Sequence, residues 1–268
     1  MTAALHREAS TGPLTAVVVG AGGTGYHLAP PLARLLAARR GSTLVVVDGK
    51  EVRNANLTRQ HGRTDVGCNK ADVLAGRIVE LLGADALTVE AVPVFLEPGE
   101  RAVHDWLDRP NLHVFSCVDN FGTRAYLETE LGARRDATMV DGGNDEFDGQ
   151  ASLWVRRNGV DVTPRPTAIN PEARAGDQRL PSQIPCDEAV VSQPQLVLAN
   201  LQSALAMLSL WYAFTHEYPT DGVDTAALPN YARFDVRRAS LVARRAGAQE
   251  DLFARPARLV EAPAGNCP

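Results

Sequence analysis

Short apolar runs alternate with longer segments of helical periodicity through the first half of the chain. The runs are rich in β-branched residues and have the length of buried strands, and they lie at 14–19, 43–48, 86–92, 112–118 and 138–141. Apolar residues recur at helical spacing over 24–40, 70–82 and 121–131. The alternation predicts an α/β fold with a Rossmann-like, mostly parallel sheet and flanking helices. Pro30 and Pro31 predict a kink or a late start in the first helix.

The second half of the chain has a less regular pattern. A later strand is predicted over 150–155, and a long helix over 192–214 with Ser192 as a candidate cap. Residues 157–185 between them are rich in Pro, Arg and Gly and have little periodicity, so we expect a long loop. Residues 233–242 predict a small closing pair of strands.

The composition is that of a globular protein, with 45% hydrophobic and 22% charged residues. A net charge of -5 argues mildly against a nucleic-acid partner. We also expect no membrane segment and no leader peptide, because no apolar run is long enough and the first residues are polar. The four cysteines are far apart and lack paired spacing, so neither a disulfide framework nor zinc is expected. These features predict a cytoplasmic protein.

The first apolar run ends in a glycine-rich loop, Gly20-x-Gly22-Gly23-x-Gly25, directly before a helix. Glycines there let the backbone approach a phosphate, and the N-terminus of the helix adds unpaired N–H groups and a positive dipole end. Asp48 ends the next run, where a carboxylate can accept hydrogen bonds from a ribose. The two features indicate a nucleotide, but NAD, FAD, ATP and a tight turn without ligand all stay open.

Amide and basic side chains follow this carboxylate. Asn56, Arg59 and Gln60 lie close together, and Lys70 begins the next predicted helix. A dehydrogenase has no need for this set. A triphosphate does, because arginine forms bidentate phosphate contacts and lysine supplies a compact charge. Each residue alone would more often be a solvated surface group, so it is the combination that favours ATP.

Asp119 and Asn120 follow the fourth apolar run, directly after Cys117-Val118. Ligands of open parallel sheets bind outside the carboxyl ends of the strands. A carboxylate there can hold Mg²⁺ against phosphates. The alternative is an ordinary cap for the helix that begins at Phe121.

Together these motifs resemble the ThiF/MoeB/HesA family, which includes the ubiquitin-activating enzymes. The resemblance covers roughly residues 14–156 and resumes at about 181–213. Within the family the chain is most similar to the ThiF-type proteins of bacterial PRTRC gene clusters. The residues that carry this closer likeness are Val66-Gly-Cys-Asn-Lys-Ala71, Asp141-Gly-Gly-Asn144 with Gly149-Gln150, Arg179-Leu-Pro181, and Cys186 followed by Pro194-Gln195 and Asn200.

The resemblance implies an adenylyltransferase that uses ATP and Mg²⁺. Such an enzyme activates the C-terminal carboxylate of a ubiquitin-like protein or peptide and releases pyrophosphate, and it works as a homodimer. The site residues carried over by motif fall into three groups. The nucleotide would be bound by Gly20, Gly22, Gly23, Gly25, Asp48, Gln60, Asp119 and Asn120, with Asp48 on the ribose. Asp119 would also be the metal ligand. Asn56, Arg59 and Lys70 would stabilise the charge of the triphosphate in the transition state.

The resemblance also divides the chain. It implies an adenylation domain (14–250) with a crossover loop at about 157–191, and the sequence pattern on either side of the domain predicts a flexible N-terminal arm (1–13) and a disordered tail (251–268). Cys186 lies in that loop, where some relatives use a cysteine to take the acyl group. Transfer to Cys186 and a merely structural cysteine are both open.

The chain departs from the family pattern at two positions that bear on catalysis. Lys50 stands where many relatives have a second acid. The N-terminus offers only His6 and Arg7 in place of the arginine segment of relatives. Either Arg7 or another residue does that work, or the chain is a weak or non-catalytic member. An NAD-dependent oxidoreductase and a nucleotide-binding scaffold without turnover are therefore the alternatives.

Overall fold

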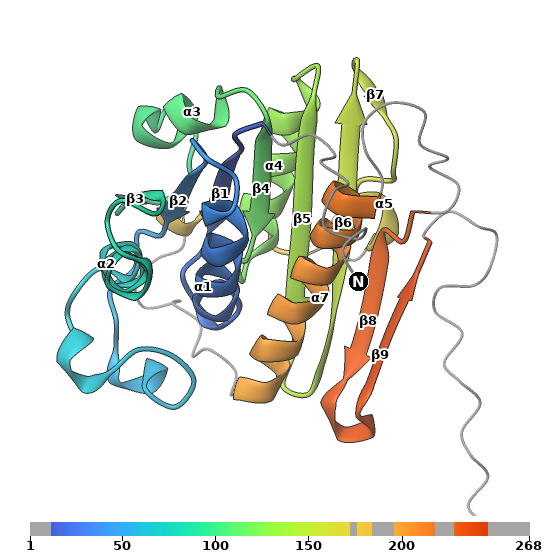
Figure 1. The fold of residues 1–268 in the computed structure, drawn as a ribbon. Helices are drawn as coiled ribbons and strands as arrows, with labels where there is room; N and C mark the ends of the chain where they lie inside the picture. Colours follow the sequence, from blue (N-terminus) through green and yellow to red (C-terminus); the bar gives the residue numbers. More distant parts are fainter. Residues whose placement is uncertain (1–11, 172–175, 184–195, 218–227, 246–268) are drawn as a thin grey trace, which may run out of the picture.

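A single mixed sheet runs through the molecule (Figure 1). The computed structural model describes residues 12–171, 176–183, 196–217 and 228–245. Within them, nine strands follow the order β3-β2-β1-β4-β5-β6-β8-β9, with β7 paired to β6. Their bounds are β1 Thr15–Val19, β2 Thr43–Val47, β3 Thr88–Val92, β4 Leu112–Ser116, β5 Ala137–Asn144, β6 Asp148–Arg157, β7 Val160–Asp161, β8 Tyr231–Asp235 and β9 Ser240–Arg244.

The first five strands are parallel and the remaining strands are antiparallel. Residues of β1, β2 and β4 pair in register, so that Val19 lies opposite Val47 and Ser116. The carboxyl ends of these three strands therefore meet at one edge. The residues that follow them, beginning with Gly20, Asp48 and Cys117, are brought together there.

Helices cover both faces of the sheet. Their bounds are α1 Gly23–Ala37, α2 Lys70–Leu82, α3 Arg101–Leu107, α4 Phe121–Gly132, α5 Pro166–Ile169 and α7 Val197–Glu217, with short 3-10 turns η1 Asn54–Asn56, η2 Arg63–Asp65, η3 Pro181–Gln183 and η5 Val236–Arg238. Successive residues of a strand point to opposite faces. Val18 and Val46 thus pack with α1, α2 and α7, whereas Val17 and Val45 pack with α3 and α4.

The predicted fold class is confirmed, and each predicted strand of the first half is present. Helix α3 was not predicted, because its seven residues are too few to show a clear period. The prediction that the first helix starts late, at its prolines, is wrong. The helix begins at Gly23, since Leu28, Leu32 and Leu36 are fully buried while the prolines lie toward the partly exposed side.

The predicted long loop contains regular structure in the residues that the structure describes. Strand β7, helix α5 and the turn η3 all lie between 157 and 185. Arginine and proline there made the segment look irregular. Yet Arg165 forms an ion pair with Asp161 and packs over the ring of Trp154. Ser192 lies outside the described residues, and the division of the chain at 13 and 250 stays a prediction.

Helix α7 is the most apolar of the long helices. The segment Val197–His216 is long and apolar enough to cross a membrane by length and composition, with a mean hydropathy of 1.4. Half of it is buried inside the structure, against α1, β5 and β6 (Figure 1). The core helix of a globular domain has the same properties.

A buried hydrogen bond ties α7 to the centre of the sheet. The indole Nε1 of Trp211 donates to Nδ1 of His113, at 2.9 Å. Both side chains are buried. Burial, together with repulsion from Arg157 and Arg39, lowers the pKa of His113 to about 3. A proton on Nδ1 would face the indole N–H, so the bond requires the neutral ring.

We therefore expect acid to destabilise the fold through His113. The unfolded chain binds this proton near the ordinary pKa of 6.5, whereas the folded state binds it only near about 3. The free energy of unfolding should fall by roughly 1.4 kcal/mol for each pH unit below about 6.5. His113→Gln keeps an acceptor for Trp211 without this titration. Urea unfolding between pH 6.5 and 5 should give a shallower slope for the variant, and equal slopes would contradict the assignment.

Candidate functional site

The glycine loop connects β1 to α1 at the carboxyl edge of the sheet. Gly20 has a φ of +97°, and a Cβ there would lie 2.7 Å from the carbonyl oxygen of Cys117. A Cβ on Gly25 would collide with the carbonyl oxygen of Gly20, and one on Gly23 with the side chain of Asn200. Gly22 is different, because a Cβ there would meet nothing within 4 Å. Three glycines are therefore required by packing, and Gly22 borders open space.

Asp48 fixes this loop to the end of β2. Its Oδ2 accepts from the N–H of Ala21 at 2.8 Å, and its Oδ1 accepts from the N–H of Lys50 at 2.7 Å. Burial raises the pKa of Asp48, and attraction to Lys70 partly opposes the rise. Each carboxylate oxygen retains capacity for a further hydrogen bond. Ribose hydroxyls could use that capacity.

The segment after Asp48 brings Asn56, Arg59 and Gln60 together. Asn56 ends the turn η1, and its Oδ1 accepts from the N–H of Arg53 at 2.9 Å. Among the described residues, Nε of Arg59 and Oε1 of Gln60 are buried without a hydrogen-bond partner. Such groups are costly unless something binds them. Both atoms are therefore available to a ligand that binds beside them.

Lys70 begins α2 and is buried, with 7% of its surface exposed. Burial lowers the pKa of Lys70, and attraction to Asp48 and Asp119 opposes that effect, whereas the charges of Lys50 and Arg59 add to it. Asn69 caps the helix and also donates to the backbone oxygen of Asp48, at 2.9 Å. The start of α2 is thereby attached to the end of β2.

Asp119 lies beyond β4 and forms an ion pair with Lys50, at 3.0 Å. Surrounding atoms partly shield the carboxylate and raise its pKa. Attraction to the ammonium of Lys50, together with the hydrogen bonds that the carboxylate accepts, outweighs this effect, and the pKa of Asp119 lies below its usual range. Asn120 has a structural task, because its Oδ1 caps α4 by accepting from the N–H of Thr123 at 2.7 Å.

The fit of this site to Mg²⁺ depends on Asp119. No group of three or more His, Cys, Asp or Glu side chains suited to a metal occurs in the part of the chain that the structure describes. Mg²⁺ nevertheless needs only one or two carboxylates when phosphates and water supply the other oxygens. Both oxygens of Asp119 lie within 3.3 Å of Lys50 Nζ. The residues fit one Mg²⁺ shared with a nucleotide once Lys50 has moved.

Two histidines at the site were not found from the sequence. Nε2 of His27, on α1, lies 2.9 Å from the backbone oxygen of Arg59, and it therefore donates to it. Burial lowers the pKa of His27. His61 has a φ of +61° and packs against Tyr26, and burial together with Lys70 lowers its pKa to about 4. The spacing of residues in the sequence did not indicate these two histidines, because their contacts join α1 to a segment some thirty residues later.

A segment of the predicted crossover lies over this edge of the sheet. A Cβ on Gly122, at the start of α4, would collide with the backbone oxygen of Arg179. The N–H of Ser182 donates to Oε1 of Glu97, at 2.7 Å. Residues 176–183 therefore cross from α4 to the loop after β3. Cys186, proposed as an acyl acceptor, and Arg7 lie outside the described residues.

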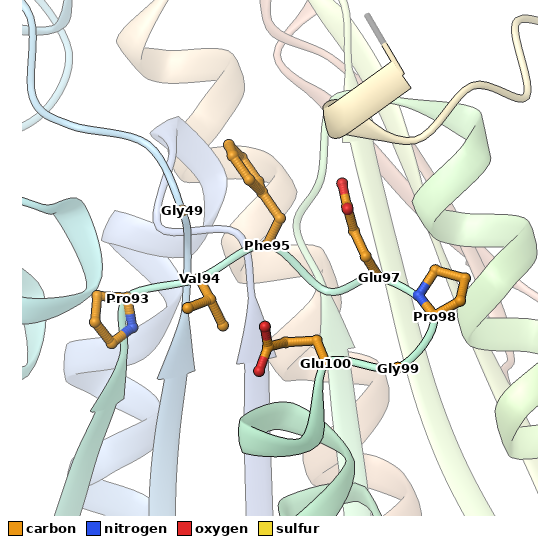
Figure 2. A pocket seen from close by; sticks show the side chains of 8 residues that line it. All are labelled: Gly49, Pro93, Val94, Phe95, Glu97, Pro98, Gly99 and Glu100. Carbon is orange, nitrogen blue, oxygen red and sulfur yellow. The ribbon is translucent and has the colours of Figure 1, made fainter.

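A hollow of about 480 Å³ lies between Gly49, the residue after Asp48, and the loop after β3. Most of the segment 93–100 lines it, and Phe95 and Glu97 point to the same side of that loop (Figure 2). A base attached to a ribose at Asp48 would have room there.

The sequence model of the ThiF family matches residues 12–241. The chain belongs to the ThiF family. This ThiF-family chain is similar to the SAMP-activating enzyme E1 of Haloferax volcanii, with 37% identity over 149 residues. The aligned region covers 52% of the chain and 48% of the relative. The chain thus spans about half the length of that relative.

Solved structures share the fold of this ThiF-family protein at low identity. E. coli MccB with AMPCPP and MccA has a TM-score of 0.61 at 15% identity, covering 87% of the chain and 63% of MccB. The structure of MccB with ATP has a TM-score of 0.59 at 15% identity, and the alignment again covers 87% of the chain and 63% of MccB. PaaA gives 0.60 at 15% identity, covering 87% of the chain and 72% of PaaA. These similarities confirm the fold, and the closer likeness to PRTRC-system proteins stays a prediction.

Substitutions in the glycine loop should separate packing from ligand binding. Gly25→Ala introduces a collision with backbone and should cost about 1–3 kcal/mol of unfolding free energy or more. Gly22→Ala meets open space and should change stability by less than about 0.5 kcal/mol. Its methyl group would nevertheless obstruct a phosphate at the loop, so we expect weaker ATP binding. Thermal unfolding and calorimetry measure both effects, and unchanged ATP affinity in stable Gly22→Ala would contradict the phosphate site.

Proposed function

We propose that this protein adenylates the C-terminal carboxylate of a ubiquitin-like protein or peptide with ATP. The observation that carries the proposal is the position of Arg59 and Lys70 around the glycine loop and Asp48. A ribose carboxylate alone suits any dinucleotide. Two buried or half-buried cations beside it suit the charge of a triphosphate. This arrangement favours ATP over the NAD-dependent alternative.

In the proposed complex the nucleotide follows the carboxyl edge of the sheet. The base occupies the hollow beside Gly49, the ribose binds Asp48, and the phosphates lie along the loop from Gly20 to Gly25 at the N-terminus of α1. Gln60 and Asn56 lie in the segment that lines the phosphate side. Asp119 is the ligand proposed for Mg²⁺, which would neutralise part of the phosphate charge. No zinc is expected.

The proposed chemistry is displacement at the α-phosphorus. An oxygen of the substrate carboxylate bonds to this phosphorus, the bond to the bridging oxygen breaks, and pyrophosphate leaves. The nucleophile is already an anion, so the protein need not supply a base. Arg59 and Lys70 contribute by holding positive charge where negative charge accumulates, in a site that is partly closed to water. His27 holds the backbone of Arg59 in place.

The names of the relatives support the proposed substrate class. One is named a SAMP-activating enzyme, and the MccB structures include its peptide MccA. A protein or peptide with a free C-terminus is therefore the proposed substrate, and the cytoplasm the proposed location. Onward transfer to Cys186 stays a prediction. A nucleotide-binding scaffold without turnover is the remaining alternative, and it would bind ATP without forming an adenylate.

Exchange of labelled pyrophosphate into ATP tests the proposal directly. The reaction mixture contains the chain, ATP, Mg²⁺ and ubiquitin-like proteins or peptides that end in Gly-Gly. Amidated copies of the peptides serve as a control because they lack the carboxylate. ATP binding without exchange for any carboxylate substrate would support the scaffold. Nicotinamide binding without ATP binding would support the oxidoreductase.

Removal of either cation should abolish this exchange. We expect Arg59→Ala and Lys70→Ala to slow it by at least about 100-fold, because each removes a charge-assisted contact to phosphate. Arg63→Ala removes an exposed arginine from the same segment and should retain normal exchange. Circular dichroism monitors the fold of each variant. Near-normal exchange in folded Arg59→Ala would refute the role of Arg59.

We also propose that two copies associate through α7. Its outward side carries Leu198, Leu201, Leu205 and Tyr212, each between 44% and 54% exposed. Their spacing places them along one side of the helix, opposite the buried Trp211 and Met207. An apolar stripe of this length on a soluble surface is typical of an interface.

A charge in that stripe should prevent dimer formation. Leu201→Glu places a carboxylate at its centre, so we expect the mass measured by light scattering to fall from that of a dimer to that of a monomer. Leu81→Glu alters an equally exposed leucine on α2, at 48% exposure, and should leave the mass unchanged. A monomeric native chain would contradict the proposal.

A further inference from the structure

The side chain of Lys50 lies over the start of the glycine loop. It follows β2, and its partner Asp119 follows β4. Strand β1 lies between those two strands, and Gly20 is the residue that leaves it. A contact of 3.0 Å between Lys50 Nζ and Asp119 Oδ2 must therefore span the end of β1. The ammonium group is held above the point where the loop begins.

The ion pair is easily broken. The side chains of Lys50 and Asp119 are 46% and 64% exposed. Exposed pairs of this kind contribute about 0–1 kcal/mol. The Lys50 backbone, in contrast, is fixed by its hydrogen bond to Asp48 Oδ1. An anion that enters the site can thus draw the ammonium away from Asp119 without moving the loop.

The charge of the site depends on this lysine. The charged groups that interact with Lys70 here are Asp48, Asp119, Lys50 and Arg59. With Lys70 itself they make three cations and two carboxylates, so the excess of one positive charge disappears when Lys50 is neutralised. A triphosphate is attracted by that excess.

The distribution of lysine in the sequence also singles out this site. Of the 27 lysine and arginine residues in the chain, only Lys50 and Lys70 are lysines. Apart from the His104–Glu130 pair, the other ion pairs of the described structure use arginine, as in Arg134–Asp108, Arg156–Asp161 and Arg179–Asp177. Lysine supplies a compact ammonium on a flexible stem, which suits a group that must change partners. Both lysines occur at this one site.

We infer that Lys50 is a phosphate-binding residue that leaves Asp119 when ATP enters and supplies part of the charge neutralisation otherwise provided by a metal ion. The inference rests on the proposed function, since it requires ATP in this site. It makes ATP binding only weakly dependent on Mg²⁺. If Lys50 merely blocked Asp119, removing its charge would strengthen binding of Mg²⁺ and ATP instead.

Calorimetry separates these outcomes, because a non-hydrolysable ATP analogue can be titrated with Mg²⁺ and with EDTA. In EDTA, Lys50→Gln should weaken binding of the analogue about tenfold or more, through loss of a charge-assisted contact. Binding of adenosine, which has no phosphate, should change less than about twofold. Lys50→Arg should restore most of the affinity. Arg53→Gln, which removes a nearby exposed cation, should bind as the native chain does.

Unchanged binding in Lys50→Gln, or tighter binding with Mg²⁺, would overturn the inference while leaving the proposed function in place. A native chain that binds no ATP would overturn both.

A spectroscopic test is available because the chain has two lysines. With ¹³C at the lysine ε-carbons, the signal of Lys50 should shift on addition of the ATP analogue in EDTA and stay in place with adenosine. A shift that requires Mg²⁺ would count against direct phosphate binding.

Discussion

The carboxylate of Asp48 is the contact on which the candidate site depends. It accepts the N–H of Ala21 from the glycine loop and that of Lys50 from its own segment. The two crossovers that start at β1 and β2 are thereby held at a fixed separation. The bridge adds to a backbone hydrogen bond between the same two segments, in which the N–H of Gly20 donates to the oxygen of Val47 at 2.8 Å. This bridge requires a buried carboxylate. Burial raises the pKa of Asp48, and the positive charge of Lys70 partly opposes that rise.

The same bridge links the sheet to the catalytic candidates. Asn69 connects the start of α2 to the backbone of Asp48, and Lys70 is the next residue. His27 connects α1 to Arg59 from the other side. The glycine loop, the carboxylate of Asp48 and both cations thus belong to one continuous set of contacts. Preorganisation of this kind lets charges stabilise a transition state without first having to reorient.

The sequence was most informative where the physical signal is local. Five β-branched runs and the glycines between them were sufficient for the parallel half of the sheet, because a buried parallel strand is apolar on both faces. Helix α3 and the short elements around Arg165 were missed, since few residues and a tertiary ion pair define them. Asp48, Arg59 and Lys70 were singled out as candidates from their motifs and spacing. His27 and the Lys50–Asp119 pair were not, because those contacts join segments from 32 to 69 residues apart.

The scarcity of lysine has a consequence for the protein itself. An acyl adenylate reacts with amines, and lysine side chains are the usual acceptors on a protein surface. Apart from the chain terminus, this protein has only two such amines. One is buried at the start of α2, and the other is ion-paired with Asp119. Arginine, which forms nearly all of its positive surface, does not accept acyl groups under these conditions. Under the proposed function, the molecule would be a poor acceptor of the groups that it activates, and its product would leave for other partners.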